Sequence, residues 1–370
     1  MNNKTVYFPG LNGLRAIAAL AVVISHTTIS LQEFNLNPNI FGTFKDGKPI
    51  GLFLAGYGVS IFFVLSGFLI TYLLQAEKEM HPINIKKFYL RRILRIWPLY
   101  YLYLILAVLT IISFKLNLNI ASLFLYIFYA ANIPAILGTY LPFLNHYWSL
   151  GVEEQFYLFW PWMNKKINKL ESLLFVLIFI LIAIKLAVHF FYQDSILDLA
   201  LITTRFHCML IGGLGAILYK KGNFLFLKVA NNKLTQLICW VVIFFAAINK
   251  FHLASIIDNE IISFVGLFLI IGQINITNRI INLERNFLNF LGKISYGIYV
   301  IHPLVIFFLS KSLSQIDLYL PLKYVLVYSI IVFTTIFLSY LSYNYFECYF
   351  LNFKKRFVVV DSSNTKNSND

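Results

Sequence analysis

The sequence predicts an all-α fold, a polytopic membrane bundle of about ten transmembrane helices. Composition is the first sign, because 59% of the 370 residues are hydrophobic and only 12% are charged. The mean hydropathy of +0.74 lies far above that of a soluble domain. Aromatic residues are the second sign, since 37 Phe and 23 Tyr suit contact with lipid headgroups. The third sign is a series of apolar runs long enough to cross a bilayer.

The predicted spans follow one another closely, with short polar loops between them. We expect ten of them, at residues 11–31, 51–75, 93–113, 146–163, 171–192, 199–219, 234–250, 257–276, 289–311 and 321–350. A further apolar run, residues 120–137, is expected to lie on the outer face as an interfacial or re-entrant helix. If it crossed the membrane, every later loop would change sides. Ten crossings place both termini on one side.

Lysine and arginine gather on one side of the membrane in this arrangement. The side of the termini holds 21 of them and the other side six, with Arg15, Lys185 and Arg205 inside spans. Both termini are therefore predicted to be cytoplasmic. The same bias accounts for the net charge of +14 without a nucleic acid partner. We expect one membrane domain, residues 1–353, and a disordered cytoplasmic tail, residues 354–370.

Two ionisable residues interrupt the first span. Arg15 and His26 are eleven positions apart, which at about 100° per residue puts them on one helix face, roughly 16 Å apart along the axis. A charged side chain within a bilayer usually faces a protein interior or an aqueous cavity. Each residue alone could be structural, as an arginine that snorkels to the interface and a histidine bonded to a carbonyl. Their shared face favours a functional stripe.

The fourth predicted span begins with NHYWSLGVEEQFYLFWPW. Ser149, Glu153 and Tyr157 recur every four positions and share a helix face, whereas Glu154 points about 100° away. In the predicted orientation Glu153 lies near the depth of His26, in the outer half of the membrane. A histidine and a carboxylate at one depth suggest a general base and its orienting acid. A structural ion pair or a proton relay would give the same pattern.

The third predicted span begins with FYLRRILRIWPLYY, in which Arg92 and Arg95 share a face and Arg91 lies off it. Arginines at a cytoplasmic helix end often serve topology alone. Beside an intramembrane arginine they could instead bind phosphates through paired hydrogen bonds. The second span carries FFVLSGFLIT, in which Ser66 and Gly67 would let another helix approach closely.

Other polar residues lie singly inside predicted spans. Tyr299 and His302 occupy adjacent turns of ISYGIYVIHP, and Lys185, His189 and Arg205 stand in other spans. Each by itself is expected to make a hydrogen bond that faces the bundle. The three cysteines show no metal-ligand spacing, so we expect no metal and no bound cofactor.

Five of these motifs, taken in order, resemble the acyltransferase 3 family, the integral membrane O-acyltransferases of bacterial surface glycans. They are R-x10-H from Arg15 to His26, FFVLSGF at 62–68, RILR at 92–95, WSLGVEEQFYLFWP at 148–161 and ISYGIYVIHP at 294–303. The resemblance extends from residue 8 to residue 353. Two positions depart from it. Asn12 stands where the family usually has aspartate, and YFECYF at 345–350 keeps Glu347 but lacks the following Arg-Pro.

The resemblance implies transfer of an acyl group, usually acetyl, from cytoplasmic acyl-CoA to a hydroxyl of a surface polysaccharide, lipopolysaccharide or lipid-linked precursor. It implies a protein of the bacterial cytoplasmic (inner) membrane, with acyl-CoA as a co-substrate, a glycan acceptor and membrane lipid as its partners. It also implies that His26 is catalytic and that Arg15, Arg92 and Arg95 serve the donor. We add Glu153 as a second catalytic residue because of its predicted depth. The candidate substrate-binding or supporting residues, which lie in the same motifs, are Ser66, Trp148, Ser149, Tyr157, Tyr299 and His302.

The alternative interpretation is a multi-pass transporter or flippase for a glycan or lipid intermediate. Ten spans with buried charges fit that class as well. The two interpretations differ in one observable, because a transporter would not move a labelled acetyl group from acetyl-CoA to glycan.

Overall fold

Long apolar helices make up most of the structure, a computed structural model that describes residues 5–40, 42–43, 53–254 and 256–362. The first half of the chain forms α1 (Leu11–Ile29), α2 (Phe53–Met80), α3 (Ile85–Ser113), α4 (Ile120–Ile127), α5 (Asn132–Ile136), α6 (Trp148–Lys166), α7 (Leu170–Phe191) and α8 (Ile196–Thr204). The second half forms α9 (Phe206–Lys220), α10 (Phe224–Ala230), α11 (Lys233–Ala247), α12 (Asp258–Ile274), α13 (Asn286–Lys293), α14 (Ser295–Leu313), α15 (Leu320–Ser342) and α16 (Cys348–Lys354). Short turns of other helix types lie at Ser30–Phe34, Asn145–Tyr147, Tyr343–Glu347 and Lys355–Phe357. The predicted helical class is confirmed.

Seven helical segments within the described residues are long and apolar enough to cross a membrane, or eight if the bent pair α10 and α11 is one span. The seven are Leu11–Phe34, Phe53–Met80, Ile85–Ser113, Leu170–Phe191, Ile196–Lys220, Ser295–Leu313 and Leu320–Phe357. The predicted spans at 146–163 and 257–276 form α6 and α12, which fall outside this set. Glutamates in its first half and lysines at its end make α6 more polar, and α12 has only 17 residues. The count of ten stays a prediction.

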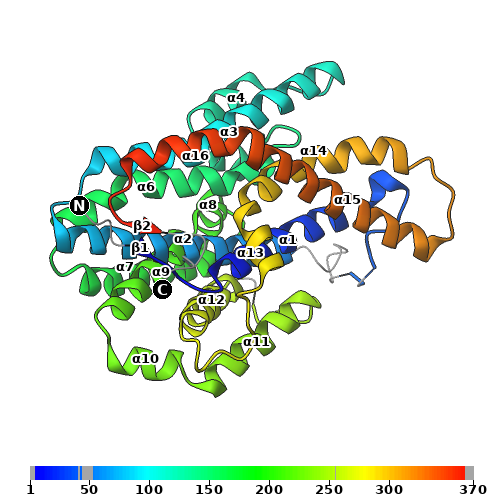
Figure 1. Cartoon of the computed structure of the whole chain (residues 1–370). Coiled ribbons are helices and arrows are strands. Elements are labelled where there is room, and N and C mark those ends of the chain that lie inside the picture. The colour runs from blue at the N-terminus through cyan, green and yellow to red at the C-terminus, as the bar shows by residue number, and fades with distance from the viewer. Residues whose placement is uncertain (1–4, 41, 44–52, 255, 363–370) are drawn as a thin grey trace.

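The apolar run at 120–137 folds into two short helices. α4 has eight residues and α5 has five, so each is far shorter than the roughly 20 residues of a transmembrane helix. α4 lies at the upper edge of the bundle in Figure 1. This arrangement agrees with a segment that does not cross the membrane.

The centre of the bundle is built on the contact between α2 and α9. A Cβ atom at Gly67 would collide with the backbone carbonyl of Met209, and one at Gly212 would collide with that of Val64. The two backbones therefore touch because both helices carry glycine at the crossing. The packing role predicted for Gly67 is confirmed, and Ser66 is left to face another direction.

Two predicted spans are interrupted in the structure. Arg205 adopts a left-handed conformation with φ of 43° and separates α8 from α9. Ile294 separates α13 from α14 within the predicted span 289–311. Hydropathy alone does not reveal such breaks, because it is averaged over the length of a whole span.

The two ends of the described chain meet. β1 (Thr5–Val6) pairs in parallel with β2 (Asp361–Ser362), close to the point where α1 begins (Figure 1). Residues 354–362 were expected to start a disordered tail, but they form the end of α16, a helical turn and this paired strand. Residues 363–370 of that predicted tail lie outside the described residues.

Candidate functional site

Polar side chains from several helices line three neighbouring cavities in the bundle. The arginine pocket is lined by Arg91, Arg92, Arg95 and Lys354, the central cavity by Arg15, Ser66, Glu153 and Tyr157, and the histidine cavity by His26, His146, Trp148 and Arg205. The arginine pocket and the central cavity share Arg92 and Arg95 in their walls. The central cavity and the histidine cavity share Tyr299. The three cavities therefore form a series that joins Arg92 to His26.

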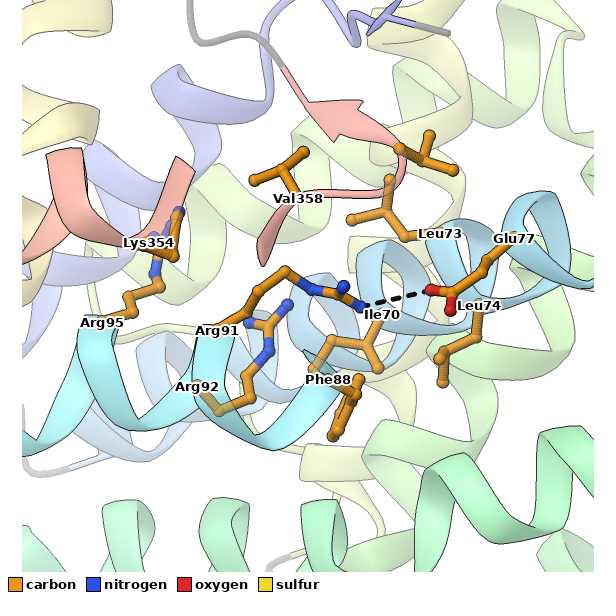
Figure 2. Close-up of a pocket in the computed structure, with 11 residues that line it drawn as sticks. Ile70, Leu73, Leu74, Glu77, Phe88, Arg91, Arg92, Arg95, Lys354 and Val358 are labelled. Atoms are coloured by element: carbon orange, nitrogen blue, oxygen red, sulfur yellow. Dashed lines mark hydrogen bonds and ion pairs between the residues drawn. The ribbon is translucent and has the colours of Figure 1, made fainter. Parts of the chain in front are cut away.

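The arginine pocket lies against the first turns of α3, as Figure 2 shows. Arg91 forms an ion pair of 3.3 Å with the buried Glu77 and donates a hydrogen bond of 3.0 Å to the carbonyl of Phe357. Arg92 instead lies 5.6 Å from the ring centres of Phe88 and Tyr157, and its buried Nε has no hydrogen-bond partner among the described residues. Arg91 is thus engaged by the protein, whereas Nε of Arg92 is a buried donor that no described residue accepts from.

Five helices contribute the polar lining of the central cavity, which includes Arg92 and Arg95 from α3 and Tyr299 from α14. α1 supplies Arg15, α2 supplies Ser66, and α6 supplies Ser149, Glu153 and Tyr157. The carboxylate of Glu153 accepts hydrogen bonds from Ser66 Oγ and, at 2.7 Å, from Tyr157 Oη. The face predicted for α6 is therefore correct.

The neighbouring Glu154 points to another part of the bundle. It accepts a hydrogen bond of 3.3 Å from Nε1 of Trp97 and is absent from the lining of the central cavity. The two adjacent glutamates thus have separate surroundings, as the helical spacing predicted.

His26 and His302 form a pair beside the histidine cavity. Nδ1 of His302 lies 3.2 Å from the carbonyl oxygen of Ile298, which can only accept, so this Nδ1 carries hydrogen. In a neutral ring Nε2 of His302 is then an acceptor, and Nδ1 of His26, at 2.7 Å, donates to it. The Nε2 atom of His26 is left with a lone pair, which is what a general base requires.

The partner of His26 therefore differs from the one that depth suggested. The ring of His302 contacts His26 directly, whereas Glu153 bonds to Ser66 and Tyr157 in the central cavity. Helical spacing cannot identify His302 as the partner, because 276 positions separate the two histidines. Both histidines belong to motifs described above, His26 to R-x10-H and His302 to ISYGIYVIHP.

Tyr299 stands between the central and histidine cavities. Its hydroxyl lies 2.6 Å from Oγ of Ser149 and donates to the carbonyl of His146 at 2.7 Å. Nε2 of His146 in turn lies 3.2 Å from the carbonyl of Val300. These bonds fix the tyrosine ring at the junction of the two cavities.

Arg205 is a residue of this site that the sequence left without a role. Its Nη1 donates to the carbonyl of Gly56 at 3.2 Å and to Oδ1 of Asn259 at 3.0 Å, and its guanidinium lies 5.3 Å from the ring centre of Trp148. The helix break at Arg205 aims this side chain into the histidine cavity. The sequence feature that could have identified Arg205 as a site residue is its charge within a predicted span.

The remaining intramembrane charges pair with one another. Lys185 lies 2.5 Å from Glu260, which is also 2.9 Å from His207. His189 contacts Asp198 at 3.3 Å. None of these residues lines the three cavities, so they serve the bundle itself. In the part of the chain that the structure describes, no group of three or more His, Cys, Asp or Glu side chains could hold a metal ion.

A bundle of apolar helices with cations and a histidine pair around neighbouring cavities defines a multi-pass membrane protein with a polar site inside the bundle. Comparison with known families gives the particular family. Residues 8–344 match the model of the acyltransferase 3 family, described as an acyltransferase domain. The chain belongs to this family.

Curated relatives are named as O-acetyltransferases. The chain is 30% identical over 371 residues to O-acetyltransferase OatA of Staphylococcus aureus strain NCTC 8325 / PS 47, and the same values hold for OatA of strain MRSA252. Each match covers 92% of this chain and 57% of the relative, so the chain spans little more than half of their length. No solved structure matches.

Proposed function

We propose that the chain is a membrane O-acyltransferase that moves an acyl group, acetyl in the first instance, from acyl-CoA to a hydroxyl of a cell-surface glycan or its lipid-linked precursor. One observation carries this proposal. A series of cavities begins at a cluster of arginines and ends at a histidine that holds a free lone pair. An anionic donor and a hydroxyl acceptor fit the two ends of that series.

The donor would bind at the arginines. Coenzyme A carries several phosphate charges, and guanidinium groups bind phosphates through paired hydrogen bonds. Arg92 and Arg95 line both the arginine pocket and the central cavity, and Arg15 lies further in. The thioester arm would then extend past Ser66 and Glu153 toward Tyr299.

His26 would act on the acceptor hydroxyl. Its Nε2 takes the hydroxyl proton as the oxygen attacks the thioester carbonyl carbon. The carbon–sulfur bond breaks, and the proton passes to the departing thiolate. His302 holds the ring through Nδ1 and stabilises the transient imidazolium, so it is a positioning residue.

The direction of transfer follows from the proposed topology, with ten spans and both termini in the cytoplasm of a bacterial inner membrane. Two observations support it. The bias of 21 basic residues against six favours cytoplasmic termini. The pairing of β1 with β2 requires an even number of crossings between residues 6 and 361, which eight or ten satisfy and seven does not. The arginine pocket, close to residue 358, then opens on the cytoplasmic side.

The test is acyl transfer in membrane vesicles of a deletion strain that expresses the chain. Labelled acetyl-CoA is supplied at the cytoplasmic face, and label is followed into glycan or lipid-linked saccharide. An O-acyltransferase yields a labelled acceptor, and mild base releases the label from it as acetate. Uptake or movement of saccharide without any label on it would instead establish the transporter or flippase alternative.

Donor binding is tested separately with purified protein. Arg92→Ala and Arg95→Ala should each weaken acetyl-CoA binding by about 1.5–3 kcal/mol, the scale of charge-assisted hydrogen bonds. Lys87→Ala is the matched control, because Lys87 is an exposed cation on the same helix. If the two arginine variants bind acetyl-CoA like the wild type, these arginines only set topology and the donor site lies elsewhere.

A further inference from the structure

The C-terminal segment forms one wall of the arginine pocket. We call residues 354–360 the C-terminal strap. Lys354 at the end of α16 lines the pocket together with Val358 and Val360 of the extended segment that follows. Figure 2 shows Lys354 and Val358 on one side of the pocket and the arginines of α3 on the other. The strap therefore covers a site whose opposite wall comes from a helix more than 250 positions earlier in the sequence.

The strap is fastened at both ends and in the middle. α16 packs along α3 at its start, and β2 pairs with β1 just after its end. Between them Arg91 donates its hydrogen bond of 3.0 Å to the carbonyl of Phe357. Val360 is buried, with 8% of its surface exposed. These contacts keep the strap over the pocket.

The charges in the pocket point to an anionic ligand. Arg91, Arg92, Arg95 and Lys354 line it, and the carboxylate of Glu77 in its wall is already paired with Arg91. The buried Nε of Arg92 has no partner among the described residues. A buried guanidinium donor without a partner is costly, and an anion with several acceptor oxygens removes that cost.

We propose that the C-terminal strap completes a phosphate-binding site in the arginine pocket, with Lys354 as a cationic contact from the strap. The inference rests on the proposed function, in which the phosphates belong to acyl-CoA. Lys354, Val358 and Val360 thereby become part of the donor site, whereas the exposed Lys355 lies outside its lining.

The test is titration of acetyl-CoA into the purified full chain in phosphatidylcholine nanodiscs at fixed salt. Lys354→Ala should weaken binding about tenfold, since one charge-assisted hydrogen bond of about 1.4 kcal/mol is lost. Lys354→Arg should keep most of the affinity. Lys355→Ala, which removes the adjacent exposed cation, should change it by less than about twofold. Equal affinities for wild type and Lys354→Ala would overturn the role of the strap.

Two further measurements distinguish a donor bound against the strap from a pocket that holds lipid. Acetyl-CoA should slow amide hydrogen exchange in residues 354–360, and unchanged exchange there would overturn the contact between donor and strap. Anionic phosphatidylglycerol in the nanodiscs should not remove the difference between wild type and Lys354→Ala. If it does, the pocket holds a lipid headgroup and the donor assignment is wrong. A wild type that binds no acetyl-CoA at all would instead refute the proposed function.

Discussion

His26 is the residue on which the proposed chemistry depends. Its Nδ1 is committed to His302, and the carbonyl of Ile298 fixes the tautomer of that second ring. The arrangement resembles a base with an orienting group, except that the orienting group is a neutral imidazole. A neutral partner suits a buried position, where a second charge would be expensive.

We expect His26→Ala to lower acyl transfer by about 10²–10⁴-fold, the usual contribution of a positioned general base. The variant should still insert in the membrane and bind acetyl-CoA, because His26 lines neither the arginine pocket nor the central cavity. Labelled acetyl transfer and acetyl-CoA titration measure the two properties. Activity above about a tenth of wild type would exclude the role of base.

The adjacent glutamates provide an internal comparison. Glu153→Gln should reduce transfer at least about tenfold, since its carboxylate accepts from two hydroxyls in the central cavity and an amide oxygen accepts more weakly. Glu154→Gln should leave transfer within about threefold, because its partner is Trp97 outside that cavity. The measurement is the initial rate of acyl transfer for the two variants at matched expression levels. Equal losses would mean that both glutamates act only through folding.

At the scale of single residues, the sequence predicted which side chains share a helix face. It predicted less well which side chains from different helices contact one another. The spacing of Ser149, Glu153 and Tyr157 was enough to place them in one cavity, because a helix fixes the angle between its own residues. Contact between His26 and His302 depends on how α1 packs against α14, which no local spacing encodes. Arg205 was visible as an intramembrane charge, but its position depends on a helix break.

Helices α2 and α9 carry the site at the scale of elements. α2 contributes Ser66 to the central cavity, and α9 begins directly after Arg205 of the histidine cavity. The glycine contact between the two backbones sets the distance between these side chains. The geometry of the site therefore depends on glycines that carry no functional group.

Gly67→Ala should separate the two helices, because its Cβ would overlap the backbone carbonyl of Met209. We expect a loss of about 1–3 kcal/mol in stability and a parallel loss of activity. Gly266→Ala is the control, since a Cβ there would lie 3.7 Å from its nearest neighbour, Ile61. The measurement is the midpoint temperature of thermal unfolding in detergent for the wild type and the two variants. A stable Gly67→Ala protein with full activity would contradict the close contact.

Element boundaries were less predictable than element positions. Each predicted span corresponds to helical segments, since hydropathy reports burial in lipid or protein. Hydropathy does not report the left-handed backbone conformation at Arg205, whose side chain donates to acceptors from α2 and α12. The ordered strap was missed for a similar reason, because its stability comes from β1 and Arg91, far away in the sequence.

At the scale of the whole molecule, the two ends of the described chain lie side by side. Pairing of β1 and β2 links the start of α1 to the end of α16, so the arginine pocket lies near both. This closure was not predictable from composition, although the even number of predicted spans agrees with it.

Labelling of single cysteines tests the topology. In a background without Cys208, Cys239 and Cys348, a cysteine at the exposed position 166 should react with an impermeant maleimide only after the cytoplasm is opened. A cysteine at the exposed position 311 should react from outside. The expectation follows from the charge bias of the loops. Reaction of position 166 from outside would show that residues 120–137 cross the membrane or that the orientation is inverted.

Tyr299 has a consequence for the energy supply of the cell. A row of polar cavities through a bilayer would let protons leak down the membrane potential unless something sealed it. The tyrosine ring, fixed by Ser149 and the carbonyl of His146, lines both neighbouring cavities, and we expect it to act as such a seal. Tyr299→Ala in proteoliposomes should therefore speed the decay of an imposed pH gradient, whereas the wild type should stay tight. The seal would let a two-carbon group pass outward while the bulky coenzyme and the proton gradient stay where the cell needs them.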